Sequence, residues 1–409
     1  MKIGITLIIY TALLLLNLQT TNGQLLLRFE EGKATAYSLN GGDEFETSEL
    51  DRDKWMTAYP WARHLYCSMD VSVYSDGEDL LLKNGQLHIT ARRAPVTTKA
   101  IPYEKDDFLL TCAHKPTVKN LMDFDFQSGL IYSKQQFTYG YYEMNFKADP
   151  GEGFWPAFWL FGEDNQEIDI FEIGGTKTSS YHVDVHCKNG CDNYKRFLGI
   201  FRSNWGDYLE TNTNWSTGFH TAAIDWTNEG ISWFIDGTPI AWWKGQFKDP
   251  MSIIANLAVT DKEGTFGGKV NEKTKFPSEM TVEFIRVWQP DPRAVLKFRK
   301  DYRVPAINND TVVEVIRKKK PEFKKKVFKN MPDRIFAVLT KSNQLELEVR
   351  SVKNSEFSVA IKNSAGKIII SQQLTTGKNK ITLKDMPAGQ YSVIVNRADI
   401  QSMFTLEMP

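Results

Sequence analysis

One six-residue stretch, Glu167–Glu172 (EIDIFE), constrains this chain more than any other. Its pattern predicts a β-strand with Ile168 and Ile170 on one face and Glu167 and Asp169 on the other, because side chains alternate along a strand. Carboxylates so close together repel one another, which disfavours a purely structural role. The stretch therefore indicates a site where neighbouring carboxylates serve a chemical purpose.

The direction of Glu172 decides what these carboxylates can do together. In strict alternation Glu172 points away from Glu167, but one extra residue in a β-bulge, at Ile170 or Phe171, returns it to the same face. The two glutamates then lie about 13 Å apart at their Cα atoms, at roughly 3.3 Å per residue. Converging side chains can approach the roughly 5–5.5 Å that a retaining glycosidase requires between nucleophile and acid/base. An ordinary solvated strand is the alternative.

An apolar stretch before this strand, residues 153–162, carries Trp155 and Trp159 at even spacing. Indole rings stack on the apolar faces of sugars, so both residues are candidates for substrate binding. Packing in the core is the equally weighted alternative, since large aromatic side chains usually serve there.

A second alternating stretch, residues 181–186, places His182, Asp184 and His186 on one face. If this strand neighbours the carboxylate strand, its polar face meets the carboxylates. His186 is then a candidate to bond a substrate hydroxyl or to tune Glu172, and a hydrogen-bonded structural histidine is the alternative.

The chain resembles glycoside hydrolase family 16, in the bulged E-x-D-x-x-E branch that holds laminarinases, agarases, porphyranases and κ-carrageenases. The resemblance covers about residues 40–290, and its motifs are SGLIYSK at 128–134, FTYGYYE at 137–143, FWPAFW at 154–159 and EIDIFE at 167–172. It implies a curved antiparallel β-sandwich of the jelly-roll, concanavalin-like type, with a glycan cleft on the concave face. It also implies that Glu167 is the nucleophile, Glu172 the acid/base and Asp169 the helper between them.

Many members of that family carry a structural calcium ion on the convex side. The matching positions are Glu44, the carbonyl of Gly85 and Glu283, and oxygen ligands of this kind suit calcium. Ordinary surface carboxylates are the alternative. Catalysis by the carboxylates requires no cofactor.

The N-terminal residues 1–23 are typical of a secretory signal, with Lys2 before an apolar run and Thr21-Asn22-Gly23 at the expected cleavage site. The apolar run is shorter than the ~20 residues that span a membrane, and no later stretch is long enough. We expect a secreted or cell-surface, monomeric protein that begins near Gln24. Charge is balanced, with 50 basic and 50 acidic residues, so net charge predicts no partner.

The four cysteines fit export, because disulfides persist outside the cell. Three pairings are open, and Cys67–Cys112 with Cys187–Cys191 is favoured because Cys187 and Cys191 flank a turn-like segment. A zinc site from these cysteines with His186 is the weaker alternative.

Composition divides the rest of the chain. All 11 Trp fall between Trp55 and Trp288, which predicts a catalytic domain over 24–290. Residues 291–334 hold 14 basic and 6 acidic residues, a net charge of +8, and predict a solvated basic linker or a segment that holds an anionic polysaccharide. Residues 335–409 predict a small C-terminal β-sandwich that resembles type IX secretion sorting domains; a carbohydrate-binding module is the alternative. Nucleic acid is a poor partner for an exported chain.

Together these features predict a secreted, retaining endo-β-glycosidase acting on a polysaccharide. The resemblance favours a β-1,3-glucan of the laminarin type. An endo-hydrolase of an algal galactan such as agar, porphyran or carrageenan is the runner-up, and a transglycosylase would use the same residues. A non-catalytic glycan-binding lectin on the same fold is the alternative from a different class.

Overall fold

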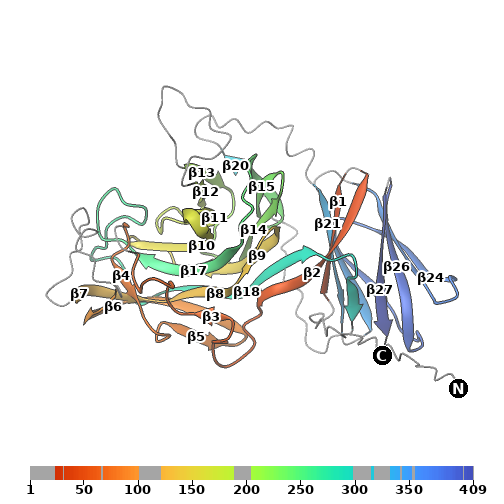
Figure 1. Ribbon diagram of the computed structural model, residues 1–409, viewed down its shortest axis with the longest axis horizontal. Coiled ribbons are helices and arrows are strands. Elements are labelled where there is room, and N and C mark those ends of the chain that lie inside the picture. Colours follow the sequence, from red (N-terminus) through yellow and green to blue (C-terminus); the bar gives the residue numbers. More distant parts are fainter. Residues whose placement is uncertain are drawn as a thin grey trace, which may run out of the picture.

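The computed structural model describes residues 24–30, 32–65, 68–100, 121–187, 204–297, 315–316, 332–340, 343–351, 355–398 and 400–408. Regular structure in these ranges consists of β-strands and one three-residue 3-10 helix, η3 (Glu163–Asn165). The predicted all-β class is therefore confirmed for the described residues (Figure 1).

An eight-stranded antiparallel sheet carries the predicted catalytic strand. The strands, in their order across the sheet, are β20 (Val315–Ile316), β13 (Asn204–Thr211), β12 (Ser180–His186), β11 (Glu167–Glu172), β10 (Phe154–Gly162), β17 (Met251–Val259), β8 (Leu130–Phe137) and β3 (Trp55–Met56).

A fourteen-stranded sheet packs against its inner face. Its main path is β16 (Thr238–Trp243), β15 (Gly230–Ile235), β14 (His220–Thr227), β9 (Gly140–Ala148), β18 (Ser278–Pro290), β2 (Lys33–Asp43), β1 (Gln24–Glu30), β21 (Asp333–Leu339), β22 (Gln344–Arg350) and β25 (Gly377–Thr382). The strands β4 (Ser72–Tyr74), β5 (Leu80–Lys83), β6 (Gln86–Thr98) and β7 (Met122–Ser128) join it beside β18.

The two sheets share one large apolar core, which confirms the predicted sandwich. Apolar residues of β11 supply it from one side, and Phe171 stacks on Phe146 of β9 with ring centroids 4.2 Å apart. From the opposite sheet, Trp233 donates a hydrogen bond from Nε1 to the backbone carbonyl of Asp169 at 2.8 Å. The core thus fixes the back of β11 while its other face stays available for polar groups.

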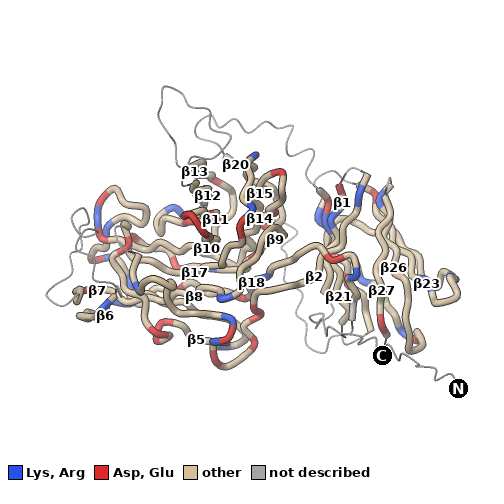
Figure 2. The backbone as a smooth tube through the Cα atoms, in the orientation of Figure 1, with Lys and Arg blue, Asp and Glu red and all other residues tan. Residues whose placement is uncertain are grey.

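β11 contains the predicted bulge. Phe171 pairs with Phe158 of β10 and Asp169 pairs with the next residue, Trp159, so Ile170 is the extra residue. The register with β12 shifts over the same interval. Because of this shift, Glu172 returns to the face that carries Glu167 and Asp169. The acidic positions of β11 stand out in red in Figure 2.

A second, smaller β-sandwich lies beside the first (Figure 1). Its five-stranded sheet has the order β19 (Val295–Lys297), β27 (Ile400–Met408), β26 (Gly389–Arg397), β23 (Phe357–Lys362) and β24 (Ile368–Leu374). This sheet packs against β1, β21, β22 and β25 around a separate apolar core.

The ends of this smaller sandwich differ from the predicted boundaries. The sequence placed residues 24–30 in the catalytic domain, but β1 pairs with β21 from Gln24↔Val338 to Phe29↔Asp333, and Leu25, Leu27 and Phe29 are part of the second core. Residues 295–297, predicted as linker, form β19 and pair with β27. Strand periodicity reports a buried face but not which distant strand will cover it.

The long strand β2 joins the two sandwiches, since it pairs with β1 at one end and with β18 at the other. A third apolar cluster fills the seam, with Tyr141 and Trp288 from the large sandwich against Phe336 of β21. The two bodies are therefore connected by a continuous sheet and a packed interface.

Several predictions fall outside the described residues, namely the signal segment, most of the basic linker, and Cys67, Cys112 and Cys191. Cys187 is described, but the other three cysteines lie outside these ranges, so the pairings stay predictions. Within the described part of the chain, no helix has the length and apolar character needed to cross a membrane.

Candidate active site

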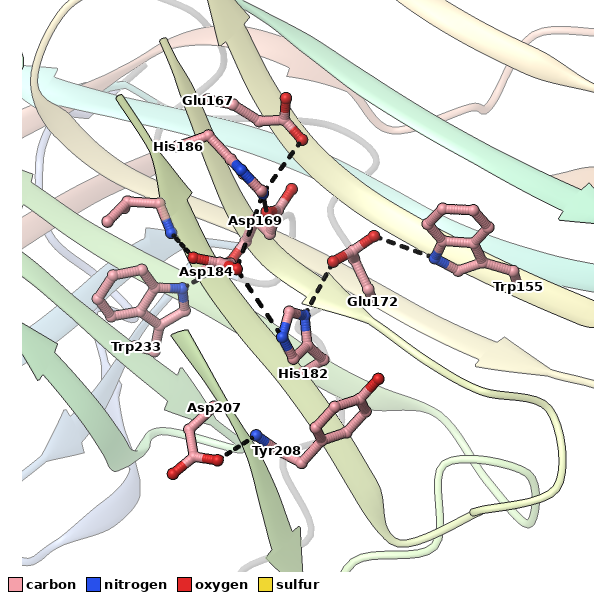
Figure 3. Close-up of polar contacts among 11 residues, drawn as sticks. Trp155, Glu167, Asp169, Glu172, His182, Asp184, His186, Asp207, Tyr208 and Trp233 are labelled. Atoms are coloured by element: carbon pink, nitrogen blue, oxygen red, sulfur yellow. Dashed lines mark hydrogen bonds and ion pairs between the residues drawn. The ribbon is translucent and has the colours of Figure 1, made fainter. Parts of the chain in front are cut away.

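The strands β11 and β12 form the centre of the site (Figure 3). Since they are antiparallel neighbours, their register sets polar residues opposite one another in three pairs: Glu167 with His186, Asp169 with Asp184, and Glu172 with His182. The sequence prediction that the polar faces of these two strands meet is therefore confirmed.

Glu172 is held through both of its carboxyl oxygens. Trp155 donates from Nε1 to Oε1 at 3.1 Å, and His182 Nδ1 lies 2.9 Å from Oε2. The Glu172 side chain is 14% exposed. This carboxyl group is thus fixed in direction and still open to a proton acceptor in the groove.

Glu167 is the most accessible of the three carboxylates, with its side chain 27% exposed against 2% for Asp169. A hydrogen bond joins the carboxyl groups of Glu167 and Asp169. His186 Nε2 lies 3.9 Å from Glu167 Oε1 and 3.3 Å from Asp169 Oδ2. Glu167 can therefore reach a substrate atom while Asp169 supports it from below.

Burial raises the pKa of Glu167 well above its ordinary value, and repulsion from Asp169 and Glu172 adds to this, while His186 acts in the opposite direction. Burial also raises the pKa of Asp169, with repulsion from Glu172 and Asp184. Two hydrogen-bonded carboxyl groups share one proton. Desolvation penalises a charge most at Asp169, which is the deeper group. The two carboxyl groups therefore titrate as one coupled pair, in which burial disfavours a second negative charge.

The histidine expected to tune Glu172 is a different one. The sequence prediction named His186, whereas His182 contacts Glu172 and His186 lies beside Glu167 and Asp169. The reason is the antiparallel connection: residues nearest the turn between two strands pair with each other. This rule was available from the sequence and would have selected His182.

An open groove runs over the carboxylates. Both predicted tryptophans line it, but in different ways. Trp155 is part of the groove wall, where its ring stacks on Phe266 at 5.2 Å, whereas Trp159 is 6% exposed and donates from Nε1 to Asn256 Oδ1 at 2.8 Å. Trp159 thus combines the two roles weighed for it, because it packs in an apolar cluster and also borders the groove.

Sequence reasoning missed an aromatic wall on the Glu172 side. Phe266 stacks on Tyr208 with centroids 5.5 Å apart, and Tyr208 lies 4.6 Å from the ring of His182. Burial and the charge of Glu172 raise the pKa of Tyr208 to about 12, so its hydroxyl stays neutral. For Phe266 a signal existed, since an aromatic residue between Gly264 and Gly267 indicates a loop that displays it.

A second aromatic wall comes from the loop before β4. Tyr59 and Trp61 stack at 5.1 Å with an angle of 6° between their planes, and Trp61 packs against Phe161 of β10 at 5.2 Å. Both residues line the groove. Trp61 therefore both borders the groove and packs against β10.

The residues suggested for calcium do not fit that ion. Both carboxylate oxygens of Glu44 accept hydrogen bonds from Arg286, each at 2.7 Å. Glu283 accepts one from Gln86 at 3.2 Å. A calcium ion would have to displace the arginine from Glu44, so no role in this protein's chemistry is assigned to it.

Comparison with known proteins connects this geometry to a family. The family model "Glycosyl hydrolases family 16" matches residues 69–279. The beta-glucanase of Rhodothermus marinus is 30% identical over 284 residues, which cover 63% of this chain and 87% of the relative. The endo-1,3-1,4-beta-glycanase ExsH of Rhizobium meliloti is 28% identical over 265 residues, covering 61% of this chain and 51% of the relative, so the chain spans about half of that protein.

Among solved structures, SCLam, a non-specific endo-beta-1,3(4)-glucanase, superposes with a TM-score of 0.50 at 24% identity, over 65% of this chain and 96% of that chain. This likeness concerns the fold alone and agrees with the sandwich described above. The matched segment contains the whole of β10, β11 and β12, and with them the three carboxylates. The chain is therefore a glycoside hydrolase and belongs to glycosyl hydrolase family 16.

Proposed function

We propose that the protein is a retaining endo-β-glucanase that hydrolyses a β-1,3-glucan of the laminarin type. One observation carries the proposal: the bulge at Ile170 sets Glu167 and Glu172 on one face of β11, in an open groove with aromatic walls. The two relatives named above, a beta-glucanase and an endo-1,3-1,4-beta-glycanase, support a β-glucan as substrate.

The reaction proceeds by double displacement. Glu172 donates its proton to the glycosidic oxygen while the carboxylate of Glu167 attacks the anomeric carbon, so the leaving sugar departs and a glycosyl-enzyme ester forms. Glu172, now a carboxylate, takes a proton from water as the water oxygen attacks the same carbon. The ester bond to Glu167 breaks, and the product keeps the β configuration.

The surrounding contacts support these roles. Trp155 and His182 hold Glu172 at opposite oxygens, which keeps it aimed at the glycosidic oxygen. Asp169 is hydrogen-bonded to Glu167 and supports the attacking carboxylate from below. The stacked rings on both sides of the groove offer faces for sugar rings.

The decisive experiment measures product release from laminarin, mixed-linkage glucan, agarose, porphyran and κ-carrageenan. Wild type is compared with Glu167→Gln, Glu172→Gln and, as matched control, Glu163→Gln, an exposed glutamate of η3. We expect cleavage of laminarin with the first product in the β configuration, and a loss of about 10²–10⁴-fold in the two site variants only.

Other outcomes would decide between the alternatives. Cleavage of a galactan but not of laminarin would show that the substrate is a galactan and not a β-1,3-glucan. An α product would contradict the double displacement. Binding of a polymer without cleavage, equal in wild type and both site variants, would indicate a lectin.

We further propose that residues 1–23 direct export and that the smaller sandwich serves in secretion sorting. The composition of the N-terminal segment and the likeness of residues 335–409 to sorting domains support this. Mass spectrometry of the protein from the culture medium tests it, with an N-terminus near Gln24 expected. A full-length chain retained in the cells would contradict it.

A further inference from the structure

One imidazole nitrogen in the groove has three carboxylates around it. His186 Nε2 lies 3.3 Å from Asp169 Oδ2, 3.7 Å from Asp184 Oδ2 and 3.9 Å from Glu167 Oε1. The His186 side chain is 39% exposed, so solvent reaches this point, while Asp169 and Asp184 are each 2% exposed. Glu167, Asp169 and His186 therefore each bring one ligand atom within 4.8 Å of the others, at a position that is buried on one side and open on the other (Figure 3).

A second observation points to a ligand at this position. Asp169 Oδ2 is buried and accepts no hydrogen bond from the described residues, and it is the oxygen nearest to His186 Nε2. A buried carboxylate oxygen without a donor is costly. A cation bound between Asp169 and His186 would supply the missing partner.

The separations suit one class of cation. Ligands bonded to a tetrahedral zinc ion at about 2.0–2.2 Å lie roughly 3.3–3.6 Å from one another. The distances from His186 Nε2 cover 3.3–3.9 Å, so small rotations of the side chains would complete the shell. An imidazole among carboxylates suits zinc, whereas calcium and magnesium prefer oxygen alone. We propose that Glu167, Asp169 and His186 form a binding site for Zn²⁺ or a dication of the same class.

A neighbouring carboxylate, Asp184, supports the ligand His186 in advance. Asp184 accepts a hydrogen bond at Oδ1 from the amide of Val185 at 2.7 Å, which leaves Oδ2 directed toward His186. Such contacts orient a ligand before the metal arrives. The site is therefore held by two neighbouring strands rather than by flexible loops.

The metal would act as an inhibitor of the proposed hydrolysis, and this consequence rests on the proposed function. A zinc ion that takes a lone pair of Glu167 prevents attack on the anomeric carbon. It also occupies the position of the reacting sugar. Substrate and metal would then compete.

Isothermal titration calorimetry tests the binding. The chain is prepared without a polyhistidine tag and titrated with zinc chloride. We expect one zinc ion per chain, with at least about tenfold weaker binding in His186→Ala, since even supporting residues of metal sites contribute that much. The matched control is His88→Ala, because His88 contacts a single carboxylate, Glu279, at 2.8 Å outside the groove. Asp169→Asn provides a second variant of the same shape and should also weaken binding.

The outcomes separate this proposal from the proposed function. No binding to wild type, or equal binding by wild type, His186→Ala and Asp169→Asn, would overturn the site. In the activity assay, zinc should raise KM without changing kcat, both in wild type and in His88→Ala. A chelator should reverse this rise in KM. Unchanged kinetics at saturating zinc would overturn the inhibition. A chain that cleaves no polysaccharide but binds zinc through His186 would leave the site intact and remove the hydrolase proposal.

Discussion

Asp169 is the residue whose chemistry depends most on its surroundings. Its carboxyl group lies beneath Glu167, with its side chain 2% exposed, and burial together with the charges of Glu172 and Asp184 raises its pKa. The folded chain therefore binds more protons at this position than the unfolded chain does at pH values above the ordinary range of an aspartate, about 4. Stability falls as the pH rises through that window.

Replacing Asp169 with Asn should remove this penalty. We expect a higher midpoint of thermal unfolding than wild type at pH 7, with the difference vanishing as the pH falls toward 4, and a lower kcat because an amide cannot exchange a proton with Glu167. Thermal unfolding across this pH range measures the first effect. Asp53→Asn, at an exposed aspartate, is the control and should follow wild type. A variant less stable than wild type at pH 7 would contradict the raised pKa of Asp169.

Glu44 carries a prediction about metal removal. Because Arg286 already binds both of its carboxylate oxygens, a chelator should leave the thermal midpoint unchanged. Unfolding scans with and without EDTA, and with added calcium, measure this. A midpoint that rises by several degrees with calcium and falls on chelation would restore the calcium site that the family resemblance implied.

At the scale of the element, β11 shows how far sequence reasoning extends. Alternation correctly assigned Glu167 and Asp169 to one face, and the chemistry of the pair required a bulge. The choice between Ile170 and Phe171 was left open, because it depends on the packing partners. The core accepts Phe171, which stacks on Phe146, and the bulge therefore falls on Ile170.

Deletion of Ile170 tests the role of the bulge. Without the extra residue, Glu172 would turn toward the apolar core and lose Trp155 and His182 as partners. We expect loss of at least about 10²-fold in activity together with reduced stability. Activity on the cleaved polymer and the thermal midpoint measure the two effects.

Ile170→Val is the matched control for this deletion. It keeps the bulge and removes one buried methylene, so it should cost about 1 kcal/mol in stability and leave activity near wild type. A deletion variant that retains wild-type activity would contradict the proposal that the bulge positions Glu172.

At the scale of the whole molecule, the sequence predicted two sandwiches but not how they join. The pairing of β1 with β21 links residues more than 300 positions apart and leaves no local signal. The same holds for the buried charges at the seam. Arg28 and Arg334 appear in sequence as ordinary surface cations, yet both contact Asp225 of β14, with side chains 14%, 5% and 2% exposed, respectively.

This cluster makes the smaller sandwich an integral part of the enzyme. Arg28 belongs to β1, Arg334 to β21 and Asp225 to the large sandwich, so one carboxylate connects both bodies. A neighbouring ion pair also connects the two bodies, because Nη1 of Arg350 in β22 lies 3.6 Å from Oε2 of Glu143 in β9. Charges taken out of water at an interface must keep their partners, because an uncompensated one is strongly unfavourable.

Asp225→Asn should therefore destabilise the whole molecule. The substitution removes the carboxylate that the guanidinium groups of Arg28 and Arg334 share, while Arg28 keeps Glu30 at 2.8 Å, and we expect this to cost about 3–5 kcal/mol. Lys380→Ala is the control, since its pair with Glu346 has a lysine side chain that is 64% exposed and should contribute roughly 0–1 kcal/mol. In calorimetry of the full chain, the loss should appear in the unfolding of both sandwiches, because the seam belongs to both. An effect confined to the smaller body, or no larger than that of the control, would mean that the large sandwich is stable independently of its neighbour.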